Sequence, residues 1–249
     1  MHDVLVLGSG VAGLSAALGA ARTGCSVLVL TRGAIADTNT RWAQGGVAAA
    51  LRTPDTPDLH LADTLVAGAG MCDAAAVHVL VREGPDRVRE LATLGAHFDE
   101  TPEGTWALAR EGGHSLARVV HAGGDATGAE IERALIAAVA ASDIEVREGW
   151  AVIELLVEQG RCTGVIALDP SGLAVNVRAL DTVLATGGNG QCFAVTTNPA
   201  GATGSGVALA LRAGVACADL EFVQFHPTAL HVPTMPRPLL SEALRGEGA

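Results

Sequence analysis

The chain has 249 residues, of which 49% are hydrophobic and 17% are charged, so it can bury a substantial core and is not a disordered segment. Its formal net charge of −11 argues against nucleic acid or an anionic membrane surface as the main partner, but does not exclude a small anionic substrate in a locally positive site. All 16 basic residues are arginine, which excludes a lysine nucleophile, a Schiff-base lysine and a P-loop lysine.

The five cysteines are scattered and include no CxxC pair, which favours buried thiols in a reducing compartment over disulfides or metal ligands. No basic segment precedes an apolar stretch at the start of the chain, and no run of about 18 uncharged apolar residues occurs. We therefore expect no signal peptide, no membrane span, no metal site and a cytoplasmic location.

The first thirty residues carry the clearest motif. An apolar run over Val4–Leu7 meets glycines at Gly8, Gly10 and Gly13, and an alanine-rich segment with helical spacing leads to a second apolar run over Val27–Leu30. This order predicts strand, tight turn, helix and parallel strand. Gly8 permits the turn, Gly10 lets the backbone approach a pyrophosphate, and Gly13 lets the helix pack on the strand. The pattern predicts dinucleotide binding; the alternative is an ordinary strand-to-helix turn.

The rest of the chain alternates helical and β-type patterns. Beyond Trp150, three short β-type runs separated by turn residues predict an antiparallel meander. The expected elements are, in order, a polar loop over 31–46, helices capped by Asp58 (to about Gly68) and by Asp73 (to Leu94), a short hairpin over 97–109, a glycine-rich loop over 110–128, a helix over 129–141, a parallel strand over 144–147, meander strands over 151–158, 161–169 and 173–178, a buried strand over 182–185 and a helix over 206–213.

The dinucleotide is expected to be FAD. The acidic residue that binds the ribose of NAD about 20 residues after the glycines is absent, because the second strand ends in Thr31-Arg32-Gly33. Ala17 suits close helix packing, and the crossover out of the parallel sheet is a β-meander. The strand after the meander ends in the glycine turn Ala185–Gly188. These three features favour FAD.

Seven motifs then occur in a specific order: GSGVAG at 8–13, WAQGG at 42–46, EGGHS at 111–115, DATG at 125–128, ATGG at 185–188, QFHPT at 224–228 and RGEGA at 245–249. Together they resemble the succinate dehydrogenase/fumarate reductase flavoprotein superfamily and, more narrowly, the L-aspartate oxidase family, which begins quinolinate and NAD biosynthesis. The resemblance covers the whole chain.

The resemblance implies an α/β fold: a Rossmann-like FAD-binding domain with a parallel sheet and a β-meander crossover over residues 1–219, and the beginning of a capping domain over 220–249. It also implies that the chain is the N-terminal portion of a longer enzyme and is inactive or nearly so by itself, since relatives carry further catalytic groups beyond this point.

The resemblance implies FAD bound without a covalent link, because Asn39 stands where covalent members have histidine. At Ser205 relatives often have aspartate, so one charge near the cofactor is lost. The residues expected to contact FAD are Gly8, Ser9, Gly10, Val11, Ala12, Gly13, Arg32, Asn39, Thr40, Arg41, Trp42, Ala43, Gln44, Gly45, Gly46 and Ser205.

The resemblance also implies a substrate site. Glu111 stands where succinate and fumarate enzymes have an uncharged residue, and a carboxylate there can pair with the ammonium group of aspartate. His226, whose ring we expect Phe225 and Pro227 to fix, can donate to a substrate carboxylate, and Ser241 and Glu242 match the hydroxyl–glutamate pair of the same wall. The alternative for Glu111 is a solvated loop carboxylate.

The implied reaction is oxidation of L-aspartate to iminoaspartate, with O₂ (giving H₂O₂) or fumarate as acceptor and possible handover to quinolinate synthase. His114 and Ser115 either line the site or serve the loop structurally. Two other functions stay open: a relative acting on succinate or fumarate, and a non-catalytic flavin-binding fragment.

Overall fold

The structure is a computed structural model that describes residues 1–226 and 228–240. The described chain forms two compact units. Unit 1 contains Met1–Trp42 and Leu135–Leu240, and unit 2 contains Ala43–Ala134. The expected domain boundary at residue 219 stays a prediction.

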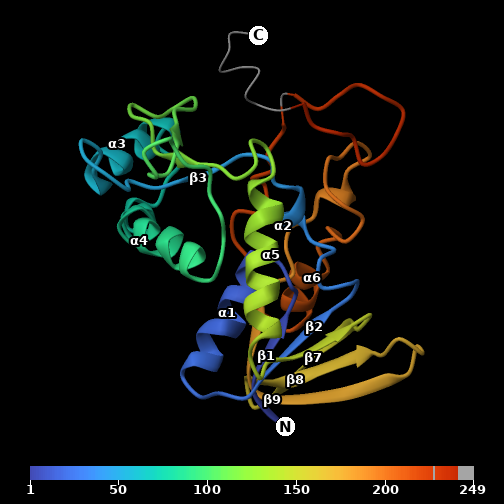
Figure 1. Ribbon diagram of the computed structural model, residues 1–249. Helices are drawn as coiled ribbons and strands as arrows, with labels where there is room; N and C mark the ends of the chain where they lie inside the picture. Colours follow the sequence, from blue (N-terminus) through green and yellow to red (C-terminus); the bar gives the residue numbers. More distant parts are fainter. Residues whose placement is uncertain (227, 241–249) are drawn as a thin grey trace. The chain divides into compact units, whose positions relative to one another are not determined.

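Unit 1 is built on a six-stranded sheet in the order β6-β2-β1-β9-β8-β7. Figure 1 labels β1, β2, β7, β8 and β9 of this sheet. β1 pairs in parallel with both β2 and β9, and β2 pairs in parallel with β6. This confirms the expected α/β fold with a parallel sheet. The strands are β1 (His2–Leu7), β2 (Val27–Thr31), β6 (Glu145–Glu148), β7 (Ala151–Glu158), β8 (Arg161–Leu168) and β9 (Ala174–Leu184).

β9 joins the meander to the parallel sheet. Its first half pairs antiparallel with β8, from Ala174 to Arg178, and its second half pairs in parallel with β1, from Ala179 to Leu184. The prediction of two separate strands here was wrong, because no turn residue interrupts residues 178–182 and Val177 and Ala179 continue one buried face. The meander itself is confirmed: β7, β8 and β9 are consecutive antiparallel neighbours.

The helices of unit 1 are α1 (Val11–Arg22), α2 (Asn39–Trp42) and α6 (Ser205–Arg212), with a 3₁₀ turn at Gly190–Cys192. α2 lies inside the segment expected to be a loop. The Thr38 hydroxyl accepts a hydrogen bond from the Arg41 amide at 3.4 Å, which caps this single helical turn.

The core of unit 1 lies between the sheet and its helices. Leu5, Leu28 and Val165 are fully buried, and Ala17 of α1 is also at 0% exposure, as expected for close helix packing. The core cluster comprises Leu5, Leu7, Leu28, Leu30, Leu155, Val165, Ala167, Val177, Ala179 and Leu209.

Unit 2 contains two packed helices and a small antiparallel sheet in the order β3-β5-β4. β5 lies within the segment 110–128 that was expected to be a loop, and β4 pairs with β5. The short hairpin expected over 97–109 is confirmed, because Glu100 forms an antiparallel bridge with Trp106 and the Ala107 amide donates to the Asp99 carbonyl oxygen at 2.7 Å. The elements are β3 (Val47–Ala48), α3 (Pro57–Ala67), α4 (Ala74–Thr93), β4 (Leu108–Ala109), β5 (Val119–Val120) and α5 (Thr127–Ala140), whose last turns belong to unit 1.

One expected helix cap is wrong and one is confirmed. α3 is capped by Thr56, whose hydroxyl accepts from the Leu59 amide at 3.2 Å, and Pro57 occupies the first helical position. Asp58 lies two residues beyond this N-cap, inside the first turn of the helix. Asp73 caps α4 as expected, accepting from the amides of Ala75 and Ala76.

Three observations concern the described residues only. Residues 1–226 and 228–240 contain no helix with the length and apolarity of a bilayer span. Within the same ranges, no group of three or more His, Cys, Asp or Glu side chains has a metal-binding arrangement. All five cysteines are free thiols, but none is fully buried and Cys192 is exposed, so the expectation of buried thiols was wrong.

Candidate cofactor and substrate site

Two of the three N-terminal glycines are required by the fold itself. Gly8 follows β1 with φ +110°, and a Cβ there would lie 2.3 Å from the Ala185 carbonyl oxygen at the end of β9. A Cβ on Gly13 would lie 2.0 Å from the Gly8 carbonyl oxygen. The roles predicted for Gly8 (tight turn) and Gly13 (close packing of helix on strand) are confirmed.

Gly10 differs from the other two because no backbone atom lies close to the position of a Cβ. It is the N-cap of α1, and a Cβ there would contact only side chains, Thr40 Oγ1 at 3.2 Å and Thr38 Cβ at 3.9 Å. Thr40 Oγ1 accepts from the Val11 amide at 2.9 Å. The first-turn amides of a helix, here including Ala12, have no partner inside the helix and carry its positive end, so this surface fits a pyrophosphate.

Ser9 supports the turn through its side chain. Its hydroxyl is buried and donates to Thr31 Oγ1 at 3.1 Å, which links the glycine turn to the end of β2. A contact of Ser9 with FAD would therefore come from its backbone.

Arg32 and Ser205, both predicted to contact FAD, lie together. Arg32 Nη2 donates to Ser205 Oγ and to Thr203 Oγ1, each at 3.0 Å. The contact joins the carboxyl end of β2 to the N-terminus of α6. Sequence reasoning missed Thr203, although a hydroxyl two residues before Ser205 in a glycine-rich turn was a usable signal.

Asn39 lies beside the glycine turn that follows β9. A Cβ on Gly187 would approach Asn39 Nδ2 to 3.7 Å. The ends of β1, β2 and β9 thus bring Gly10, Arg32 and Asn39 to the carboxyl edge of parallel strands, where ligands of doubly wound sheets bind.

The end of the predicted flavin loop, Ala43–Gly46, belongs to unit 2. The Ala43 carbonyl accepts from the Gly128 amide at 2.9 Å, and a Cβ on Gly46 would lie 2.2 Å from the Val120 carbonyl oxygen. Close packing within unit 2 accounts for Gly46, and its contact with FAD stays a prediction, as do those of Gln44 and Gly45. Arg41 and Trp42, on α2, are exposed.

Glu111 lies on a loop of unit 2, where its residue is half-buried. Among the described residues the structure records no ion pair for its carboxylate. The Arg110 Nε donates to the His114 carbonyl oxygen at 3.0 Å, which closes the loop across Glu111, Gly112 and Gly113. A half-buried carboxylate without a cationic partner in the described chain suits a cationic ligand group.

A buried charge cluster lies beneath this loop, and sequence reasoning missed it. Arg118 is fully buried and binds the carboxylates of Asp55 and Asp63. Hydrogen bonds from the Ser115 amide and hydroxyl lower the pKa of Asp63 to about 2, with Arg118 adding to the effect. Burial, followed by the charge of Arg118, lowers the pKa of His60, whose ring centroid lies 5.8 Å from that of His114.

His226 belongs to unit 1. Its Nδ1 lies 3.1 Å from Thr228 Oγ1, so Thr228 fixes the ring. The expectation that Phe225 fixes it was wrong, because that side chain is 84% exposed. Pro227, Ser241 and Glu242 lie outside the described residues.

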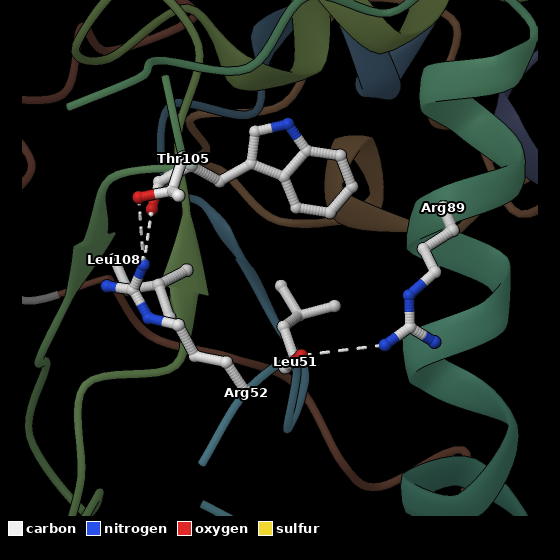
Figure 2. Close-up of a pocket in the computed structure, with 6 residues that line it drawn as sticks. Leu51, Arg52, Arg89, Thr105 and Leu108 are labelled. Carbon is white, nitrogen blue, oxygen red and sulfur yellow. Dashed lines mark hydrogen bonds between the residues drawn. The ribbon is translucent and has the colours of Figure 1, made fainter. Parts of the chain in front are cut away.

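Unit 2 also has a surface pocket with a volume of about 330 Å³ (Figure 2). Arg52 Nη1 donates there to Thr105 Oγ1 and to the Trp106 carbonyl oxygen. Arg89 Nη2 donates across the pocket to the Leu51 carbonyl oxygen at 3.5 Å. Both arginines donate to backbone carbonyl oxygens. None of the predicted site residues lines this pocket. Its lining is Leu51, Arg52, Arg89, Thr105, Trp106 and Leu108.

Curated relatives match the chain along nearly its whole length. It is 57% identical to an L-aspartate oxidase of Streptomyces coelicolor, over 99% of this chain and 44% of the relative. It is 51% identical to an L-aspartate oxidase of Mycobacterium bovis, over 99% of this chain and 47% of the relative. The chain therefore spans just under half the length of these relatives.

Solved structures with the same fold include a quinol–fumarate reductase with menaquinol molecules, with a TM-score of 0.93, 31% identity, and coverage of 99% of this chain and 43% of that one. The Mycobacterium smegmatis Sdh1 complex in the apo form matches with a TM-score of 0.91 and 36% identity, over 98% of this chain and 44% of that one. A family profile described as "FAD binding domain" matches residues 3–249. The glycine turn, the open helix N-terminus and this match agree on FAD, and the chain belongs to the FAD binding domain family.

Proposed function

We propose that this chain forms the FAD-binding part of an enzyme that oxidises L-aspartate to iminoaspartate, the first step towards quinolinate and NAD. The electrons pass on to O₂, which yields H₂O₂, or to fumarate. The similarity to L-aspartate oxidases at 51–57% identity supports this substrate, and the similarity to a fumarate reductase supports a fumarate-type acceptor.

Glu111 is the observation that carries the proposal. Succinate and fumarate lack an ammonium group, so a carboxylate on a half-buried residue with no ion pair among residues 1–226 and 228–240 suits an amino acid better. A charge-assisted hydrogen bond to a buried carboxylate contributes about 1.5–3 kcal/mol.

When bound, FAD supplies the acceptor for the hydride that leaves Cα of the substrate. The open N-terminus of α1 binds its pyrophosphate, and Arg32 and Asn39 lie at the same strand ends. Glu111 pairs with the substrate ammonium, and His226 donates to a carboxylate of the substrate. Ser241 and Glu242, which lie outside the described residues, are proposed to bind the substrate carboxylates as well. With histidine replaced by Asn39, the flavin is bound without a covalent link.

The product is an imine, which water hydrolyses readily. We therefore propose that the enzyme works in the cytoplasm beside quinolinate synthase, which would take the imine directly. Neither nucleic acid nor a membrane is a partner in this proposal.

Replacing Glu111 with Gln tests the substrate assignment. In the FAD-loaded full-length protein we expect Glu111→Gln to raise the KM for L-aspartate about 10- to 100-fold, because loss of the charge removes about 1.5–3 kcal/mol of binding. Glu83→Gln on the exposed face of α4, where Glu83 pairs with Arg87 at 4.0 Å, is the matched control and should leave the KM for L-aspartate unchanged.

The same variant separates the second candidate, a relative acting on succinate or fumarate, which the similarity to fumarate reductase supports. If the enzyme turns over succinate and Glu111→Gln leaves that activity intact, the second candidate holds. An unchanged aspartate KM in Glu111→Gln would rule out the proposed ammonium contact.

A further inference from the structure

We infer that Asp63, bound by the buried Arg118, is a positioning residue for the loop that carries Glu111 and His114. This inference rests on the proposed role of Glu111 as the partner of the substrate ammonium. The cluster lies wholly in unit 2 and consists of Asp55, Asp63, Arg118, His114 and Ser115.

Arg118 provides the fixed point of the cluster. Its side chain is 0% exposed, and its Nε and Nη2 donate to the two oxygens of Asp55 at 2.8 and 2.9 Å. This bidentate pair sets the plane of the guanidinium. Arg118 precedes β5, and Asp55 precedes α3, so the pair joins the small sheet to the start of that helix.

Asp63 connects Arg118 to the loop. One oxygen, Oδ2, accepts from Arg118 Nη1 at 2.7 Å and from both the amide and the hydroxyl of Ser115 at 2.8 Å. Three donors therefore converge on a single atom, and two of them belong to the last residue of the EGGHS motif. Because its pKa is about 2, Asp63 stays ionised at neutral pH.

His114 adds a second contact between the loop and the cluster. Its Nδ1 lies 3.4 Å from Arg118 Nη1. Since a guanidinium only donates, Nδ1 must accept, and the proton of the neutral ring is then on Nε2. The Arg110 side chain bonds to the His114 carbonyl from the other end of the loop. Glu111 thus lies on a short loop whose C-terminal end is held in place by His114 and Ser115.

The competing explanation is that the cluster only stabilises unit 2. The two explanations differ in what Asp63→Asn changes. Positioning predicts a local effect: the Asn keeps its size and can still bond Ser115, but the charge that gathers the three donors is lost. We expect amide exchange in the peptide covering 110–117 to accelerate about ten-fold, with other peptides unchanged.

Asp58→Asn is the matched control. It makes the same substitution on α3, but Asp58 is 71% exposed and pairs with Arg82 at 2.6 Å on the surface. Exchange in the 110–117 peptide should stay as in the unsubstituted protein. Ser115→Ala is a milder second variant, because it removes only the hydroxyl bond to Asp63 and leaves the Arg118 ion pairs intact. It should give a smaller acceleration confined to the same peptide.

In the FAD-loaded full-length protein we expect Asp63→Asn to raise the KM for L-aspartate several-fold more than it lowers kcat, with the visible flavin spectrum unchanged. Uniformly faster exchange with an unaltered KM would overturn the inference and leave a purely structural cluster. Unchanged exchange at 110–117 in both variants would overturn it as well. If loop exchange rises but Glu111→Gln does not affect aspartate, the positioning stands and the proposed function fails.

Discussion

At the scale of single residues, two glycines of helix α1 lie in very different surroundings. Gly13 lies where α1 meets the turn after β1, and any side chain would collide with backbone. Gly19 lies in the same helix with nothing within 4 Å of the position of a Cβ. The spacing of Gly8, Gly10 and Gly13 predicted the first case, while no pattern in the sequence accounts for Gly19.

This contrast gives a direct prediction. We expect Gly13→Ala to destabilise the protein by roughly 1–3 kcal/mol and to abolish FAD retention, because the added methyl overpacks the turn. Gly19→Ala should instead stabilise it by about 0.5–1 kcal/mol, since alanine loses less backbone entropy in a helix. Urea unfolding of both variants checks this. A Gly13→Ala protein as stable as Gly19→Ala would contradict the turn geometry.

At the scale of elements, long periodic segments were predictable and short ones were not. β1, α1, β2 and the meander follow from strong apolar patterns. β5 was missed because a two-residue strand has no period, and α2 because its cap is a single hydroxyl inside a polar segment. The cluster around Arg118 was missed for a related reason: Arg118 lies 63 residues from Asp55 and 55 from Asp63 in the sequence, and the packing of α3 near β5 brings them together.

The start of α3 offers a test at this scale. Thr56→Ala should destabilise the protein by about 1 kcal/mol, because the Leu59 amide loses its acceptor. Asp58→Ala, which removes only an exposed ion pair with Arg82 and a first-turn charge, should cost less, about 0–1 kcal/mol. Thermal unfolding of the pair measures the difference, and the reverse order would restore Asp58 as the cap.

At the scale of the whole molecule, the residues proposed to bind cofactor and substrate come from segments distributed along the chain. The proposed cofactor residues lie at the carboxyl ends of β1, β2 and β9 in unit 1, whereas Glu111 and the cluster around Arg118 belong to unit 2. The family resemblance proposed most of these residues, because ordered motifs can be recognised in loops that have no periodic pattern. It did not identify the residues behind them, such as Thr203 and Thr228, since these act through other side chains.

Non-covalent attachment of the cofactor can be measured on the whole chain. Because Asn39 offers no imidazole, we expect the purified protein to carry the visible absorption of oxidised flavin and to release all of it into the supernatant on acid precipitation. Flavin remaining in the precipitated protein would contradict non-covalent binding. A colourless protein that takes up no added FAD would favour the non-catalytic alternative without flavin.

The long strand β9 has a consequence for biosynthesis. The glycine turn is synthesised before β9, but Gly8 packs against the Ala185 carbonyl, and β1 needs the second half of β9 as its neighbour. Such distant pairing closes late in folding, because chain entropy must be overcome before the contact forms. Nascent chains shorter than about residue 185 therefore lack a complete nucleotide turn, and flavin loading follows synthesis of the meander instead of accompanying the first helix.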